Sequence, residues 1–184
     1  PIGSFMDKET ADARRASEGW EMVEDSGRGF RRVVASPLPL EIMEQAAIKE
    51  LVDKGFTVVA VGGGGIPVAK QADGTLKGVD AVIDKDFATG LLAKNLEADL
   101  LVISTAVEQV YVNFGKPDQK GIDKMSVAEA KKYIDEGQFA PGSMLPKVKA
   151  VVQFLESGGK EALITDPAHL EEAMAGKTGT WITP

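Results

Sequence analysis

Hydrophobic positions along the chain follow two spacings, one typical of helices and one typical of strands. Apolar residues at helical spacing predict helices over residues 42–55, 86–96, 127–136, 143–155 and 167–175. Short apolar runs rich in branched residues predict buried strands over residues 56–61, 99–104, 110–114, 162–165 and 178–183. Strands that alternate with helices of this length indicate parallel pairing. The predicted fold class is α/β, a three-layer αβα sandwich with a mainly parallel sheet.

The first 36 residues follow a different pattern. A short polar helix is predicted from Asp7, the expected N-cap, to Gly19. Apolar and polar residues then alternate over 20–24 and again over 30–34, with glycines between them, which predicts a β-hairpin. A helix and a hairpin bury little surface by themselves. We therefore expect a small protruding subdomain here, followed by a larger α/β domain over 37–184.

Composition excludes several classes of protein. The net charge is -7 and the pI is about 4.9, which argues against nucleic acid as a partner. The absence of cysteine excludes disulfides, thiolate metal sites and a cysteine nucleophile. No apolar run has membrane-spanning length and no signal peptide is visible, so we expect no membrane partner and a cytoplasmic location. The single histidine, His169, has no expected partner nearby and is predicted to have no chemical role.

A run of glycines follows the predicted strand 56–61. It consists of Gly62, Gly63, Gly64 and Gly65. Backbone N–H groups in such a loop can approach an anion closely, because no Cβ intervenes. The run fits neither the P-loop pattern nor the dinucleotide-binding pattern, since Ala69 and Pro67 stand where those patterns require glycine. An anion-binding loop and a tight turn with only a packing role both remain possible readings.

Two lysines lie where the predicted helices begin. Lys85 stands between Asp84 and Asp86, and Lys147 lies in the first turn of the helix that Ser143 is expected to open. A cation in the first turn of a helix, such as Lys147, interacts unfavourably with the helix dipole. Local inconsistencies of this kind are typical of functional positions. Phosphoryl transfer depends on such cations to stabilise the transferring oxygens, and a carboxylate between them would align both. Either aspartate could supply that carboxylate, and two ordinary surface lysines remain the alternative.

Six motifs, in this order and spacing, resemble those of carbamate kinases in the amino acid kinase superfamily. The resemblance extends over essentially the whole chain, and its motifs are PIGSF, EDSGRGFRRVVASP, VGGGGIPV, KGVDAVIDKD, VYVNFGKPDQ and FAPGSMLPKV. The resemblance implies reversible phosphoryl transfer between ATP plus carbamate and ADP plus carbamoyl phosphate, with Mg²⁺. It also implies a cytoplasmic homodimer, and a reaction that runs toward ATP in the arginine deiminase pathway.

The resemblance also implies roles for individual residues. Lys85 and Lys147 would stabilise phosphate, with Asp86 organising them, and Gly62–Gly65 would line the acceptor end of the site. The larger domain would bind the nucleotide, and no side chain is assigned as a metal ligand. The positions expected to hold the nucleotide are Ser104, Thr105, Tyr111, Asn113, Met144 and Lys147.

Three departures from the family pattern leave alternatives open. The N-terminal half, with much of the carbamate pocket, is expected to be missing, and so is a lysine that directly precedes the Pro-Ile-Gly motif. Ala106 and Glu108 stand where many members have aspartates. A non-catalytic nucleotide-binding or assembly module, or a phosphotransferase of the superfamily with another acceptor, therefore remains an alternative to an active carbamate kinase.

Overall fold

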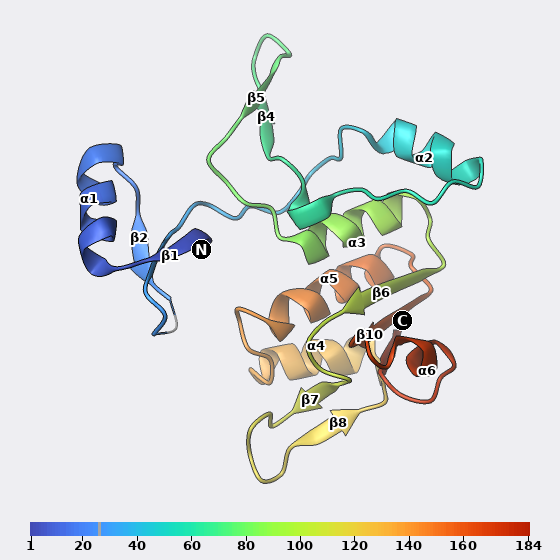
Figure 1. Cartoon of the computed structure of the whole chain (residues 1–184). Coiled ribbons are helices and arrows are strands. Elements are labelled where there is room, and N and C mark those ends of the chain that lie inside the picture. Colours follow the sequence, from blue (N-terminus) through green and yellow to red (C-terminus); the bar gives the residue numbers. More distant parts are fainter. Residues whose placement is uncertain (26) are drawn as a thin grey trace. The chain divides into compact units, whose positions relative to one another are not determined.

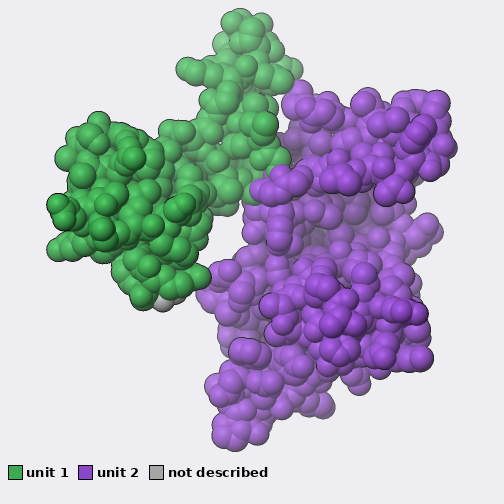
Figure 2. Space-filling view, in the orientation of Figure 1, with its two compact units in different colours: residues 1–38, 65–83 green, residues 39–64, 84–184 purple. Residues whose placement is uncertain are grey.

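The computed structural model describes residues 1–25 and 27–184 and divides into two compact units. The first unit, green in Figure 2, comprises residues 1–38 and 65–83. The second, purple in the same figure, comprises residues 39–64 and 84–184. The division of the chain into domains at residues 36 and 37 stays a prediction.

The predicted helix and hairpin both form in the first unit. Helix α1 (Lys8–Glu18) begins at Asp7, whose carboxylate accepts a hydrogen bond from the Thr10 amide, and ends at Gly19 in the left-handed conformation. Strands β2 (Met22–Glu24) and β3 (Phe30–Arg32) pair antiparallel, and β1 (Ile2–Met6) pairs with the other side of β3. Strand β1 was not predicted, because its three central residues are exposed and give no apolar alternation. Residue 26 of the hairpin loop lies outside the described residues.

Arginines packed on aromatic rings hold this small sheet together. Arg28 and Arg31 lie over the Phe5 ring, and Arg32 lies over Trp20, at 4.5, 5.1 and 4.7 Å from the ring centroids. Arg31 also pairs with Asp25, at 3.1 Å. Such cation–π contacts contribute about 0.5–1 kcal/mol each at exposed sites. The arginines of the EDSGRGFRRVVASP motif therefore have structural partners within their own unit.

The remainder of the first unit is a second hairpin. It pairs β4 (Val68–Lys70) with β5 (Leu76–Gly78) in antiparallel register. The predicted Asp73-Gly74 turn joins the strands, and the Asp73 carboxylate accepts hydrogen bonds from both the amide and the hydroxyl of Thr75. A backbone bridge between Ala35 and Ala81 connects the two parts of the unit, and so does an ion pair between Arg32 and Asp80 at 3.0 Å.

A mixed four-stranded sheet forms the centre of the second unit (Figure 1). Its order is β6 (Leu100–Ser104), β10 (Glu161–Thr165), β11 (Thr180–Thr183) and β9 (Lys124–Ser126). Strands β6 and β10 pair parallel, as do β11 and β9, whereas β10 and β11 pair antiparallel. The carboxyl ends of β6 and β10 therefore lie at the same edge, where Ser104 is opposite Thr165.

Helices cover both faces of this sheet. On one face, α4 (Val127–Asp135) and α5 (Met144–Glu156) bury Ala162, Ile164 and Ile182. On the other face, the short helix α6 (Leu170–Met174) accepts a hydrogen bond from the Trp181 indole through the Ala173 carbonyl. The unit is thus an αβα sandwich, and its core lies between the sheet and α5. None of the described helices is long and apolar enough to cross a membrane.

Two helices and a further hairpin complete the second unit. Helix α3 (Lys85–Asn95) packs beside α5, and α2 (Gln45–Asp53) lies earlier in the chain. Strands β7 (Val110–Val112) and β8 (Lys120–Ile122) pair antiparallel. Neither β8 nor β9 was predicted, since each is three residues long and too short to show a period.

The predicted strand over residues 56–61 is wrong. These residues form no strand in the described chain, and a 3₁₀ turn over Gly62–Gly64 (η1) follows them. Val58 and Ala60 pack against the small cluster that contains Ile48, whereas Val59 is 96% exposed. A strand requires a neighbouring backbone as its hydrogen-bond partner, and the described residues provide none here. The apolar pattern of these residues is that of a strand, but the described residues contain no backbone that pairs with it.

Candidate active site

The side chain of Asp86 joins the two candidate lysines. Its Oδ1 atom lies 2.8 Å from the Nζ of Lys85, and its Oδ2 atom lies 2.8 Å from the Nζ of Lys147. Lys85 is the neighbouring residue, but Lys147 comes from α5, so residues distant in sequence meet at one carboxylate. The structure therefore brings together all three residues predicted as catalytic.

The beginning of α3 explains why Asp86, and not Asp84, takes this position. Asp84 is the N-cap of the helix, and its Oδ1 accepts hydrogen bonds from the amides of Asp86 and Phe87, at 2.8 and 3.3 Å. A capping carboxylate satisfies amides that have no partner inside the helix. Asp86 in the first turn is then free to face α5. The sequence did not decide which aspartate lies between the lysines. In the structure, Asp84 caps α3 and Asp86 contacts both lysines.

Close packing between α3 and α5 brings Lys147 on α5 within reach of Asp86 on α3. A Cβ added at Gly90 would lie 3.3 Å from the carbonyl oxygen of Ala150, so the absence of a side chain permits the observed approach. Lys147 lies one turn before Ala150 on α5, and Asp86 lies one turn before Gly90 on α3. This crossing point therefore sets the distance over which Lys147 reaches Asp86.

Substitution of Gly90 by valine tests this packing. We expect Gly90→Val to destabilise the protein by about 1–3 kcal/mol, since overpacking forces the two backbones apart. The control is Lys94→Val, which places the same β-branched residue at an exposed position of α3. Urea denaturation of both variants measures the effect. Equal stability of the two variants would contradict the role given to Gly90.

Charge and burial act against each other at Asp86. Burial raises the pKa of its carboxyl group, but hydrogen bonds and charge from Lys147 and Lys85 outweigh burial and lower the pKa below its ordinary value. For Lys85, burial lowers the pKa, and the hydrogen bond and charge of Asp86 raise it more. Asp86 and Lys85 are consequently both charged at neutral pH. Asp86 has 8% of its side chain exposed and Lys147 has 12%, against 56% for Lys85.

The three residues leave a net positive charge at the first turns of two helices. One carboxylate neutralises only one of the two ammonium groups, and helix amino ends add partial positive charge. Each ammonium group has further N–H donors beyond the one directed at Asp86. Phosphate oxygens are the ligands that such a pair of fixed cations stabilises, in the ground state and during transfer.

The glycine run adopts the left-handed backbone that its composition allows. Gly63, Gly64 and Gly65 have φ values of 63°, 96° and 84°. Within the second unit, η1 packs against α3, the helix that carries Asp86, and the Gly64 amide donates to the Val61 carbonyl at 2.9 Å. Val61 itself has φ of 46°, an unusual value for a β-branched residue. The role of Gly62–Gly65 at the acceptor end stays a prediction.

The predicted nucleotide positions occupy three elements of the second unit. Ser104 ends β6, and the amide of Thr105 donates to the Thr165 carbonyl at 2.8 Å. Tyr111 lies in β7, and Asn113 follows it with φ of 52°. Met144 begins α5, three residues before Lys147. Ser104 and Thr105 thus lie at the carboxyl edge of the parallel strands, where open α/β sheets bind ligands. Their role as nucleotide contacts stays a prediction.

The β7–β8 hairpin is braced by side-chain amides and carboxylates. The side-chain amide of Asn113 donates a hydrogen bond to the Asp118 carboxylate at 2.8 Å. The backbone amide of Asn113 donates to the side-chain oxygen of Gln138 at 2.9 Å. Glu108 accepts a hydrogen bond from the Thr178 hydroxyl, and Ala106 is exposed. Glu108 therefore has a structural partner in this chain.

The premise that His169 has no partner nearby is wrong. Its Nδ1 atom lies 2.8 Å from the Asp166 carboxylate, a partner three residues earlier that the sequence reasoning overlooked. The hydrogen bond to Asp166 raises the pKa of His169 above its ordinary value. A turn between β10 and α6 creates the pair, and such turns are not visible in an apolar pattern.

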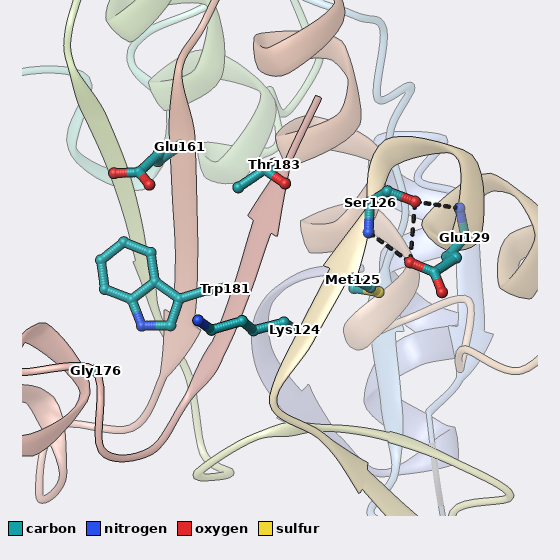
Figure 3. A pocket seen from close by; sticks show the side chains of 8 residues that line it. All are labelled: Lys124, Met125, Ser126, Glu129, Glu161, Gly176, Trp181 and Thr183. Atoms are coloured by element: carbon teal, nitrogen blue, oxygen red, sulfur yellow. Dashed lines mark hydrogen bonds between the residues drawn. The ribbon is translucent and has the colours of Figure 1, made fainter.

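A surface hollow of about 420 Å³ lies elsewhere on the second unit (Figure 3). The side chains of Trp181 and Lys124 line it, with Glu161 nearby. Glu161 begins β10, so the hollow lies at the amino end of the parallel pair, opposite the edge of Ser104 and Thr105. We therefore place the candidate site at Asp86 and its lysines and not at this hollow.

The second unit is an α/β sandwich in which one carboxylate holds two lysines. Comparisons with known proteins show the family to which the chain belongs. Residues 10–166 match the model of the amino acid kinase family. The chain belongs to the amino acid kinase family.

The similar proteins include carbamate kinases and proteins named after them. The chain is 55% identical to a carbamate kinase of Clostridium perfringens and 52% identical to the carbamate kinase-like protein YahI of Escherichia coli, each over 99% of this chain and 58% of the relative. A structure of Giardia lamblia carbamate kinase bound to AMP-PNP matches with a TM-score of 0.88 and 43% identity, over 100% of this chain and 58% of that one. The chain thus spans about three fifths of the length of the relatives it matches.

Proposed function

We propose that this chain supplies the nucleotide-side part of a carbamate kinase, which transfers a phosphoryl group reversibly between ATP plus carbamate and ADP plus carbamoyl phosphate. The observation that carries the proposal is the bridging of Lys85 and Lys147 by Asp86, at 2.8 Å each. The names of relatives at 52–55% identity support it. In this role, the two lysines stabilise charge on the transferring phosphoryl group, and Asp86 keeps both lysines aligned.

ATP and ADP are the nucleotides of this proposal. The carbamate kinase of Giardia lamblia, which is 43% identical to this chain, has a structure bound to AMP-PNP, an ATP analogue. The residues proposed to hold the nucleotide are Ser104, Thr105, Tyr111, Asn113, Met144 and Lys147, as the sequence motifs imply.

Mg²⁺ belongs to the proposal as a companion of the nucleotide. Within residues 1–25 and 27–184, no group of three or more acidic, histidine or cysteine side chains could hold a metal ion. Mg²⁺ commonly keeps several waters and binds substrate phosphates, with only one or two carboxylates from the protein. Bound in this way, it would neutralise charge on the phosphates. The homodimer and the cytoplasmic location implied by the motifs are also part of the proposal.

A second candidate is a nucleotide-binding module that does not catalyse transfer. It is favoured by one observation: the chain spans 58% of its relatives, so residues that those proteins possess are not in this sequence. This candidate predicts nucleotide binding without turnover. A third candidate keeps the site but changes the acceptor to another carboxylate, as elsewhere in the superfamily.

Enzyme assays separate these candidates. We would measure ATP formation from carbamoyl phosphate and ADP for the chain alone and for a chimera that joins it to the unmatched part of C. perfringens carbamate kinase. Transfer by the chimera supports the kinase. ADP binding without transfer in either protein supports the non-catalytic module, and transfer to another carboxylate but not to carbamate supports the third candidate.

A further inference from the structure

Gln138 links the end of helix α4 to the loop of the β7–β8 hairpin (Figure 1). Its side-chain oxygen accepts a hydrogen bond from the backbone amide of Asn113 at 2.9 Å. The two residues are 25 positions apart in sequence, and both are half-buried. Asn113 is one of the residues proposed to hold the nucleotide, whereas Gln138 has no part in the proposed function so far.

The backbone of Gln138 is fixed by the way in which α4 ends. The Gly137 amide donates to the Ile134 carbonyl and the Gln138 amide donates to the Tyr133 carbonyl, both at 3.0 Å. Gly137 lies between these bonds with φ of 68°, so the helix ends in a Schellman motif. The residue at position 138 of such a motif is frequently apolar and packs back on the helix. Here it is a glutamine, and its side chain reaches Asn113 instead.

Asn113 has an unusual backbone that several hydrogen bonds hold in place. Its φ of 52° lies in the left-handed region, which asparagine adopts more readily than most residues. Its side chain donates to Asp118 at 2.8 Å, and its carbonyl accepts from the Lys116 amide at 3.0 Å. Both of these bonds lie within the loop of residues 113–119. The bond from the Asn113 amide to Gln138 is the one that leads out of the loop.

The position of this loop therefore depends on Gln138. Among the residues that the structure describes, no other hydrogen bond joins residues 113–119 to an element outside the hairpin. The beginning of the hairpin is held separately, since the Val110 amide donates to the Thr180 hydroxyl at 2.8 Å. Loss of the Gln138 acceptor would leave the hairpin attached at its base and free its loop.

The chain after Gln138 leads directly to the start of α5. The Ala140 carbonyl accepts hydrogen bonds from the amides of Ser143 and Leu145, at 3.2 and 3.1 Å, which holds this connection in one conformation. Met144, another residue proposed to hold the nucleotide, begins the helix. Gln138 thus joins the loop of the hairpin to the connection that carries the α5 side of the proposed nucleotide site.

We propose that Gln138 is a positioning residue for the nucleotide, which holds Asn113 in place relative to the start of α5. The inference rests on the proposed function, because it takes Asn113 as a nucleotide residue. Lys85 and Lys147 are held by Asp86 and not by Gln138. Loss of the glutamine should therefore weaken nucleotide binding and leave the transfer step almost unchanged.

Gln138→Leu tests the role, since leucine is similar in size and has no acceptor atom. We expect the affinity of the 184-residue chain for ADP, measured by isothermal titration, to fall about three- to tenfold, the usual effect of one lost hydrogen bond. In the chimera, the KM for ADP should rise by a similar factor while kcat stays within about twofold. Hydrogen exchange at the Asn113 amide should become faster.

Two matched variants separate the acceptor from a general effect on the fold. Gln138→Glu keeps side-chain oxygens that accept hydrogen bonds, so slow exchange at the Asn113 amide and most of the ADP affinity should return. Gln153→Leu makes the same substitution as Gln138→Leu at an exposed position of α5 and should change neither property. Circular dichroism verifies that each variant is folded.

Three results would overturn the positioning role. They are an unchanged ADP affinity in Gln138→Leu, an equal loss of affinity in Gln153→Leu, and a fall in kcat with no change in the KM for ADP. Failure of the proposed function has a different signature, because the unsubstituted chain would then already fail to bind ADP. The positioning role would fall with it.

Discussion

Lys147→Met is expected to lower kcat for phosphoryl transfer in the chimera by about 100- to 1000-fold, the usual loss when one fixed donor to a developing oxyanion is removed. The Nζ of Lys147 is held 2.8 Å from Asp86, and its side chain is only 12% exposed. Methionine keeps the length of the side chain and removes its charge. The protein should therefore stay folded while it loses a cation at the transferring phosphate. Steady-state rates of ATP formation measure the loss.

Lys149→Met is the matched control for this prediction. Lys149 lies two residues later on α5 and is exposed. The same substitution there should leave kcat within about twofold, since an exposed charge away from the site contributes little. A similar loss in both variants would mean that α5 is sensitive to any change of charge, and the role of Lys147 would be refuted.

Asp86→Asn is expected to reduce both stability and activity. Asparagine matches the shape of aspartate but leaves Lys147 without its counter-charge in a site that is nearly buried. We expect a loss of about 1–3 kcal/mol in the free energy of unfolding at neutral pH, the usual cost of an unsatisfied buried polar group. Transfer by the chimera should fall as well, because neither lysine is held in place. Urea denaturation and the ATP-formation assay measure the two effects.

The pH dependence of this stability loss has a definite sign. The pKa of Asp86 is lowered in the folded protein, so its stabilising effect is present above the ordinary carboxyl pKa of about 3.9 and is lost as pH falls through the lower folded value. The difference between wild type and Asp86→Asn should therefore be constant near neutral pH and shrink in acid. Asp99→Asn is the control, since Asp99 pairs with Lys160 at the surface with 83% of its side chain exposed. A surface pair contributes less than about 1 kcal/mol. A larger effect at Asp99 than at Asp86 would contradict the assignment.

Local signals in the sequence predicted much of the fold. Asp7 and Ser126 begin helices as expected, and Ser126 and Glu129 form the predicted capping box. These predictions succeed because a cap needs only a few neighbouring residues. Ser143 is an exception, since α5 begins after it but its hydroxyl makes no capping hydrogen bond.

The failures involve partners that are distant in sequence or that are not found among the described residues. Residues 56–61 have a strand-like composition, but no described backbone lies beside them to form a ladder. The antiparallel pairing of β10 with β11 was not predicted, because an apolar run does not indicate whether the neighbouring strand is parallel or antiparallel to it.

The candidate site shows the same limit. Charge patterns and the family motifs singled out Lys85, Asp86 and Lys147, but only the structure shows one carboxylate between both lysines. The separation of roles between Asp84 and Asp86 depends on where the first turn of α3 begins, which sequence patterns locate only to within a few residues. The approach of α5 through Gly90 is likewise a matter of packing.

Isothermal titration of ADP into the 184-residue chain tests the central claim, that this chain contains the nucleotide-side phosphate site. The account predicts saturable binding that Lys147→Met weakens and Lys149→Met does not. Lack of binding, or binding equally strong in both variants, would contradict the claim and remove Lys85, Asp86 and Lys147 from the nucleotide site.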